Sequence, residues 1–310
     1  MRRWFWILLV GLACVLPSWS QEARRLQVLT TLPPLYSWVA SVVGDRADVV
    51  NLLPPNVGPH DYQFRPKDLR KIQKADLILL NGLELESWFA RAISANNDGA
   101  RRKIIEVAAG LPTNSLIYEL PELQVEPGGS HAHEHEHAHA GLANPHLWLD
   151  PILASHAVSN LLTALQQADP ANASVYASNA ATYQLKLHKL DQELRQAISK
   201  IPRREVVTFH DAFPYFCRRY DLKLVGVIEE VPGASPSARY LAALSKAIRD
   251  QKVGALFVEP QSEIRLARQL AKDLDIRLAI LDTLETGRLE PDAYETGMRA
   301  NLKSLQQALK

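Results

Sequence analysis

Cysteine is scarce in this sequence. Only two occur in 310 residues, and Cys14 lies within an apolar run at the N-terminus. If that run is removed on export, Cys217 alone remains. A disulfide within the mature chain is therefore excluded, because it needs two cysteines.

The chain also lacks an excess of charge of either sign and a long internal apolar run. Its 35 lysines and arginines stand against 34 acidic residues. This balance offers no basic footprint for nucleic acid, and no nucleic-acid partner is predicted. Beyond the N-terminal segment, no stretch has enough consecutive apolar residues for a membrane helix. We expect a mature protein that meets a membrane only through partners.

The first 20 residues have the pattern of an export signal. Arg2 and Arg3 precede an apolar run over residues 4–17. The expected cleavage region, Ser18-Trp19-Ser20, follows this run. The run is too short to cross a membrane. We expect cleavage before Gln21 and a periplasmic protein. Lipid attachment at Cys14 is the second interpretation, because the residues before it only partly resemble a lipobox.

After the signal, short apolar runs alternate with amphipathic stretches. This order predicts an α/β fold of two similar lobes, each a mostly parallel sheet flanked by helices. The expected strands of the N-terminal lobe, residues 21–168, are 26–31, 49–53 and 77–80, followed by helices at 36–43, 66–74 and 84–93. Those of the C-terminal lobe, residues 202–310, are 206–209, 222–228, 255–258 and 277–281.

A long helix is predicted between the lobes, over residues 169–201. Asp169 is expected to cap it and Pro170 to occupy its first turn. Apolar residues then recur at helical spacing, namely Tyr176, Tyr183, Leu187, Leu190, Leu194 and Ile198. At 1.5 Å per residue this helix would extend for roughly 45 Å. We expect a stiff rod that joins both lobes.

A histidine-rich tract interrupts this order. Its five histidines alternate with alanine and glutamate and are His131, His133, His135, His137 and His139. Such a tract has nothing to bury, so we expect a flexible loop at about residues 121–143. Imidazole suits zinc, copper and nickel alike. The loop is predicted to bind zinc weakly, apart from the main site.

Three other histidines lie where ligands gather in α/β folds. His60 follows a proline-rich turn after a strand, His146 precedes Leu147-Trp148-Leu149, and His210 ends a predicted strand. Ligands of open α/β sheets bind outside the carboxyl ends of the strands. Glu259 and Asp282 follow two further strands of the second lobe. These candidates are expected to converge on one crevice.

Zinc favours four ligands drawn from nitrogen, sulfur and carboxylate oxygen. The three histidines with Asp282 would complete a tetrahedral shell, and another acid or water is the alternative fourth ligand. Glu259 and Asp282 have a competing role as caps of the helices that follow. Histidine must be neutral to bind a metal, so affinity should fall as the pH drops through roughly 6.5.

Five motifs together carry a family resemblance over nearly the whole mature chain. They are Pro59-His60-Asp61-Tyr62, Asn81-Gly82-Leu83-Glu84-Leu85-Glu86, Asn144-Pro145-His146-Leu147-Trp148-Leu149-Asp150-Pro151, His210-Asp211-Ala212-Phe213-Pro214-Tyr215-Phe216 and Phe257-Val258-Glu259-Pro260-Gln261. The chain resembles the metal-binding solute-capture components of ABC importers (the cluster A-I family), and is most similar to their ZnuA-like zinc branch.

The resemblance implies two lobes joined by a rigid helix, with the ion in the cleft between them. It implies metal ligands at His60, His146 and His210, with Asp282 matching an acid that often completes the site. His210 favours zinc, because the manganese and iron branches usually have glutamate at that position. The implied protein is not an enzyme. It is a monomer that delivers zinc to an inner-membrane ABC permease and can receive it from periplasmic donor proteins.

Two other functions remain open from the residues alone. Three histidines with an open water position are also the ligands of hydrolytic zinc enzymes, although the sequence has no HExxH motif. A third class is an adhesin or a periplasmic metal buffer that works without a transporter. Turnover of a substrate would identify the former, and a neighbouring permease would argue against the latter.

Overall fold

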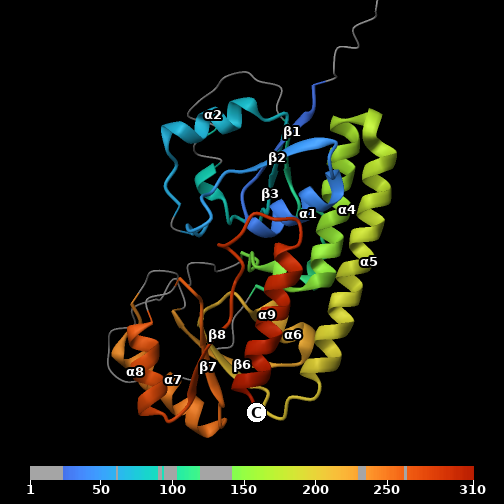
Figure 1. Ribbon diagram of the computed structural model, residues 1–310. Helices are drawn as coiled ribbons and strands as arrows, with labels where there is room; N and C mark the ends of the chain where they lie inside the picture. Colours follow the sequence, from blue (N-terminus) through green and yellow to red (C-terminus); the bar gives the residue numbers. More distant parts are fainter. Residues whose placement is uncertain are drawn as a thin grey trace, which may run out of the picture.

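Two β-sheets, each made of parallel strands, form the framework of the protein in a computed structural model. The structure describes residues 24–60, 62–89, 93, 103–118, 142–229, 235–261 and 264–310. The first sheet has the strand order β2-β1-β3-β4 and the second has β6-β5-β7-β8, so the two sheets have the same topology. Figure 1 shows the two sheets in separate parts of the molecule. The prediction of two similar parallel α/β lobes is confirmed.

The strands coincide closely with the apolar runs of the sequence. Those of the first sheet are β1 (Leu26–Thr30), β2 (Ala47–Asn51), β3 (Leu77–Leu80) and β4 (Lys103–Glu106). Those of the second are β5 (Glu205–His210), β6 (Lys223–Glu229), β7 (Ala255–Val258) and β8 (Arg277–Ile280). Only β4 was not predicted, because its residues alternate between half-buried and exposed and it lies at an edge of its sheet.

Helices cover the sheets and connect them. The described helices are α1 (Pro33–Val43), α2 (Pro66–Lys74), α4 (Pro151–Ala168), α5 (Ala173–Ile198), α6 (Pro214–Tyr220), α7 (Ala238–Asp250), α8 (Arg265–Asp273) and α9 (Ala293–Ala308), with the 3-10 turns η1 (Thr113–Ser115), η2 (Leu147–Leu149) and η3 (Pro170–Asn172). In the parts of the chain that the structure describes, no helix has the length and apolar character needed to span a membrane.

The joining helix α5 runs beside both lobes (Figure 1). It has 26 residues, about 39 Å at 1.5 Å per residue. Its apolar residues bury one face, as predicted, but the helix begins later than expected. Asp169 precedes η3, and its carboxylate accepts hydrogen bonds from Asn172 and Tyr176 at 2.7 Å each. The expected cap therefore stabilises the turn before the helix.

One hydrophobic core extends through both lobes along α5. It includes residues of β1, α1 and α4 from the first lobe (N-lobe) and of β5, α6 and α9 from the second (C-lobe). The C-terminal helix α9 contacts both α5 and α1, so it returns from the C-lobe to the N-lobe. Ser37 of α1 also donates to the carbonyl of Pro291 at 2.7 Å. Shared apolar packing of this extent favours lobes that hold a constant orientation.

The cysteine expected in the mature chain lies in this core. Cys217 is buried in α6 and is a free thiol. Burial raises its pKa to about 12. A thiol with so high a pKa is a poor metal ligand, because metals bind the thiolate. Cys217 therefore has a packing role.

Candidate metal centre

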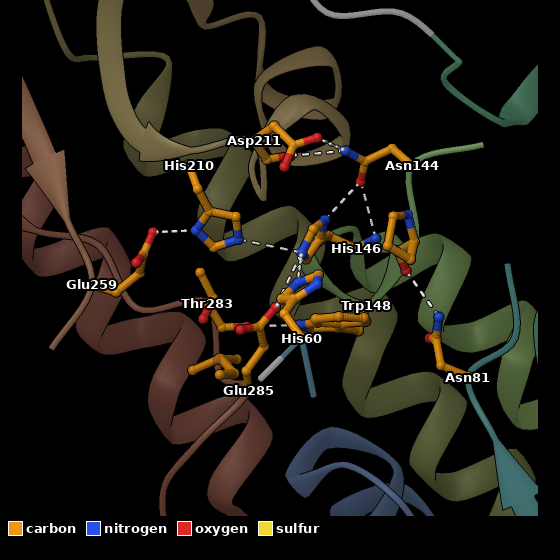
Figure 2. Close-up of polar contacts among 12 residues, drawn as sticks. His60, Asn81, Asn144, His146, Trp148, His210, Asp211, Glu259, Thr283 and Glu285 are labelled. Atoms are coloured by element: carbon orange, nitrogen blue, oxygen red, sulfur yellow. Dashed lines mark hydrogen bonds and ion pairs between the residues drawn. The ribbon is translucent and has the colours of Figure 1, made fainter. Parts of the chain in front are cut away.

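The three predicted histidines meet between the lobes (Figure 2). His60 lies in the loop after β2, His146 directly precedes η2, and His210 is the last residue of β5. The carboxyl ends of the two sheets thus provide His60 and His210, where ligands of parallel sheets are expected. The side chains of His146 and His210 are buried, whereas His60 keeps 20% of its side chain exposed.

A carboxylate completes the cluster, and it belongs to Glu285. The Nε2 atom of His146 lies 3.2 Å from Nε2 of His60 and 3.4 Å from Nε2 of His210. Oε1 of Glu285 is 3.2 Å from Nε2 of His60 and 3.1 Å from Nε2 of His146. A tetrahedral zinc site with ligands at about 2.05 Å has edges of about 3.3 Å. The four side chains therefore could hold a metal ion of that size.

Asp282 does not join this cluster. Its Oδ1 atom accepts the backbone N–H of Leu284 at 2.8 Å, and its own N–H donates to Asn301 at 2.7 Å. Leu284 then adopts a positive φ of 61°, which turns the chain before Glu285. The carboxylate that lies beside the three histidines is thus that of the acid three residues later. Asp282 does not cap the following helix either, because α9 begins only at Ala293; its carboxylate instead bonds a local turn.

Sequence reasoning missed Glu285, although a signal for it was present. Aspartate commonly accepts a hydrogen bond from the backbone two residues on. Asp282 does so in the sequence Asp-Thr-Leu-Glu, which leaves the longer glutamate as the unengaged carboxylate. Glu285 is only 3% exposed. A buried acid of this kind needs a partner, and the histidines supply it.

For His146 and His210, partners on the far side of the imidazole set which nitrogen faces the centre. Oε1 of Glu259, which directly follows β7, lies 2.6 Å from Nδ1 of His210. Oδ1 of Asn144 lies 2.9 Å from Nδ1 of His146. Both partners accept, so each Nδ1 carries hydrogen and each Nε2 is directed at the cluster. Glu259 therefore orients His210.

The segment that carries His146 is held from both lobes. Asn144 donates from Nδ2 to the carbonyl and the carboxylate of Asp211 in the C-lobe, at 2.8 and 3.1 Å. Asn81 of the N-lobe donates to the carbonyl of Pro145 at 3.0 Å. Figure 2 shows the bonds between Asn144 and Asp211 above His146 and the bond of Asn81 to its lower right. The centre is thus built across the boundary between the lobes.

Burial and neighbouring charges set the protonation of the site. Burial would raise the pKa of Glu285, but the contacting His60 and His146 hold it well below its usual value. Burial lowers the pKa of His146. Burial also opposes the charge on His210, but Glu259 outweighs it and raises the pKa of His210 to about 9. At neutral pH the site thus has an ionised Glu285 and a protonated His210.

The remaining histidines lie elsewhere. His156 on α4 and His188 on α5 are exposed and are not part of the cluster. The predicted weak zinc loop, with His131, His133, His135, His137 and His139, lies outside the described residues.

Comparisons with known proteins point to one family. The family model described as "Zinc-uptake complex component A periplasmic" (ZnuA) matches residues 28–308. The high-affinity zinc uptake system protein ZnuA of Bacillus subtilis (strain 168) is 33% identical over 298 residues, which cover 94% of this chain and 90% of that protein.

Solved structures share the fold. The solute-binding protein FpvC from Pseudomonas aeruginosa in complex with Mn²⁺ has a TM-score of 0.76 and 28% identity, covering 92% of this chain and 98% of that one. Zn(II)-bound AdcA from Streptococcus pneumoniae has a TM-score of 0.71 and 29% identity over 92% of this chain. This chain spans 58% of AdcA.

Proposed function

Because this chain belongs to the ZnuA family of zinc-uptake components, we propose that it captures Zn²⁺ outside the cytoplasmic membrane and delivers it to the permease of an ABC importer. The observation that supports this most directly is the cluster of three histidines and one carboxylate, whose ligand atoms all lie within 4.8 Å of one another. Nitrogen with a single carboxylate suits zinc, whereas manganese favours more oxygen. The zinc ion is the cargo of this site.

We propose Nε2 of His60, His146 and His210 and a carboxylate oxygen of Glu285 as the four zinc ligands. These ligands come from both lobes: His60 and His146 belong to the N-lobe, and His210 and Glu285 belong to the C-lobe. A protein shell that fills all four positions leaves none for a catalytic water, in contrast to hydrolytic zinc sites. Capture of the ion is therefore the chemistry that we assign to this centre.

His60 is the ligand through which the ion is expected to enter and leave. Its side chain is 20% exposed, against 1% for His146 and 4% for Glu285. The loop of His60 is linked to that of Glu285 by the backbone N–H of Gly287, which donates to the carbonyl of Pro55 at 2.7 Å. The shared core favours release by local movement of such loops over wide rotation of the lobes.

Metal analysis and growth test this function. Protein purified without chelating resin should contain one tightly bound zinc per chain. In zinc-poor medium, deletion of the gene should slow growth, and the intact gene should restore it. A deletion strain that takes up zinc normally would contradict an import role, and protein that prefers manganese would contradict the choice of cargo.

Zinc affinity should rise with pH up to about 9. His210 is protonated below its pKa of about 9, and zinc must displace that proton from Nε2. The zinc Kd should therefore fall about tenfold per pH unit between pH 7 and 9. Calorimetry in buffers of different ionisation enthalpy would count the released proton.

Glu259→Gln is the control for this pH dependence. Glutamine can still accept the hydrogen bond from Nδ1 of His210, but it lacks the charge that raises the pKa. In this variant the dependence should flatten above about pH 7, since His210 would approach its usual pKa. A wild-type Kd that is constant from pH 7 to 9 would contradict the assigned protonation of His210.

The histidine-rich tract is proposed as a weak secondary zinc site. Deletion of residues 131–139 should lower the number of weakly bound zinc ions and leave one tight site, because the four proposed ligands lie outside the tract. Calorimetric titration of the deletion variant would measure both classes of site. Loss of the tight site would mean that the tract supplies a primary ligand.

We further propose that the mature protein begins near Gln21, is a periplasmic monomer, and can receive zinc from periplasmic donor proteins. The N-terminal pattern described above supports a cleaved signal. Mass spectrometry of the exported protein would give its first residue. A diacylglycerol-modified Cys14 at the N-terminus would show a lipoprotein instead.

A further inference from the structure

Trp148 lies beside the metal centre, at the boundary between the lobes (Figure 2). It is the middle residue of η2 and is fully buried. The centroid of its ring is 5.2 Å from that of His146. A buried tryptophan normally donates its N–H in a hydrogen bond, so the acceptor identifies the segment that the tryptophan positions.

The acceptor is the main chain beside Glu285. The indole N–H of Trp148 donates to the carbonyl of Thr283 at 2.7 Å. The hydroxyl of Thr283 is buried and has no hydrogen-bond partner among the described residues. The threonine side chain therefore does not anchor this turn. Asp282 braces the turn from within the C-lobe, and Trp148 holds it from the N-lobe.

A second bond joins Trp148 to the same segment of the C-lobe. The hydroxyl of Tyr294, near the start of α9, donates to the carbonyl of Trp148 at 2.6 Å. Thr283 and Tyr294 bracket the connection between β8 and α9, which carries Glu285. Both ends of this connection are thus bonded to one residue, which is two positions from His146.

We infer that Trp148 is a positioning residue for the zinc site. Its indole N–H holds the main chain at Thr283 so that the Glu285 carboxylate lies against His60 and His146. The inference rests on the proposed function, in which Glu285 is a zinc ligand. Groups that orient metal ligands typically change affinity by about 10- to 100-fold when they are removed.

Trp148→Phe tests this role, because it keeps an aromatic ring and removes the N–H. The zinc Kd should rise about tenfold, measured by competition with a chromophoric chelator. Trp38→Phe is the matched control. Trp38 is also fully buried, but its indole N–H has no hydrogen-bond partner among the described residues. Its replacement should leave the zinc Kd unchanged.

A double-mutant cycle separates positioning from a general structural role. In the Glu285→Gln background, Trp148→Phe should weaken binding no further, because both changes act on the same ligand. An equal tenfold loss in that background would overturn the inference, as would a Trp148→Phe protein with the wild-type Kd. If Trp148→Phe does not fold, benzothienylalanine at position 148 keeps the shape of indole, replaces N–H by sulfur and should give the same loss.

The zinc affinity of the wild-type protein distinguishes failure of the proposed function from failure of the role assigned to Trp148. Wild-type protein that fails to bind zinc would overturn the proposed function and this inference together. Tight binding by the wild type with the same Kd in Trp148→Phe would overturn the role of Trp148 alone.

Discussion

Replacement of His146 by alanine should weaken zinc binding by about 100-fold or more. Nε2 of His146 lies within 3.4 Å of a ligand atom of each of His60, His210 and Glu285, so it is central to the cluster. Structural zinc sites bind with about 10–16 kcal/mol, which averages about 2.5–4 kcal/mol per ligand among four. A loss of about 3 kcal/mol corresponds to more than 100-fold in Kd. Competition with a chelator of known affinity would measure it.

The control for this variant is His156→Ala. His156 is exposed on α4 and is not part of the cluster, so its loss should leave the zinc Kd unchanged. Circular dichroism of both metal-free proteins would show whether either change disturbs the fold. Wild-type affinity in His146→Ala would remove His146 from the ligand set.

Glu285→Gln should weaken zinc binding by about 100-fold. The amide is nearly isosteric with the carboxylate but has no charge, so the buried dication loses its only anionic ligand in the proposed shell. The pKa of Glu285 is held well below its usual value, and the carboxylate is therefore available as an anion throughout the physiological range. The zinc Kd of this variant, measured at constant pH, provides the test.

Asp282→Asn is the same chemical change three residues earlier. Asparagine retains the Oδ1 acceptor that Asp282 offers to the N–H of Leu284, so the turn should persist. Its zinc Kd should stay close to that of the wild type. The opposite pattern, with a large effect at Asp282 and none at Glu285, would restore the ligand assignment that the sequence first favoured.

The strands and lobes could be predicted because burial imposes a local pattern. Parallel strands covered on both faces appear as short apolar runs, as β3 and β7 do. The edge strand β4 has no such run, because its side chains alternate between half-buried and exposed. β4 is instead specified by its pairing with β3, which is a non-local contact.

The histidine ligands could also be proposed from local context. His60 follows a strand and His210 ends one, and the carboxyl ends of parallel strands are where ligands gather. The sequence Asp-Thr-Leu-Glu is compatible with the turn between Asp282 and Glu285, but it does not show which of the two acids faces the histidines. Both are acids in the same connection, and their roles depend on the turn at Leu284 and on the position of Asn301 in α9.

The sequence by itself determined the two-lobed α/β framework, the three histidines and the zinc preference, because strand ends and nitrogen ligands follow from residue type and order. Only the tertiary structure decided that Glu285 faces the cluster, that Glu259 and Asn144 orient its histidines, and that Trp148 holds the opposite loop. These contacts join residues far apart in the chain. Their geometry depends on hydrogen bonds across the lobe boundary, which no local pattern encodes.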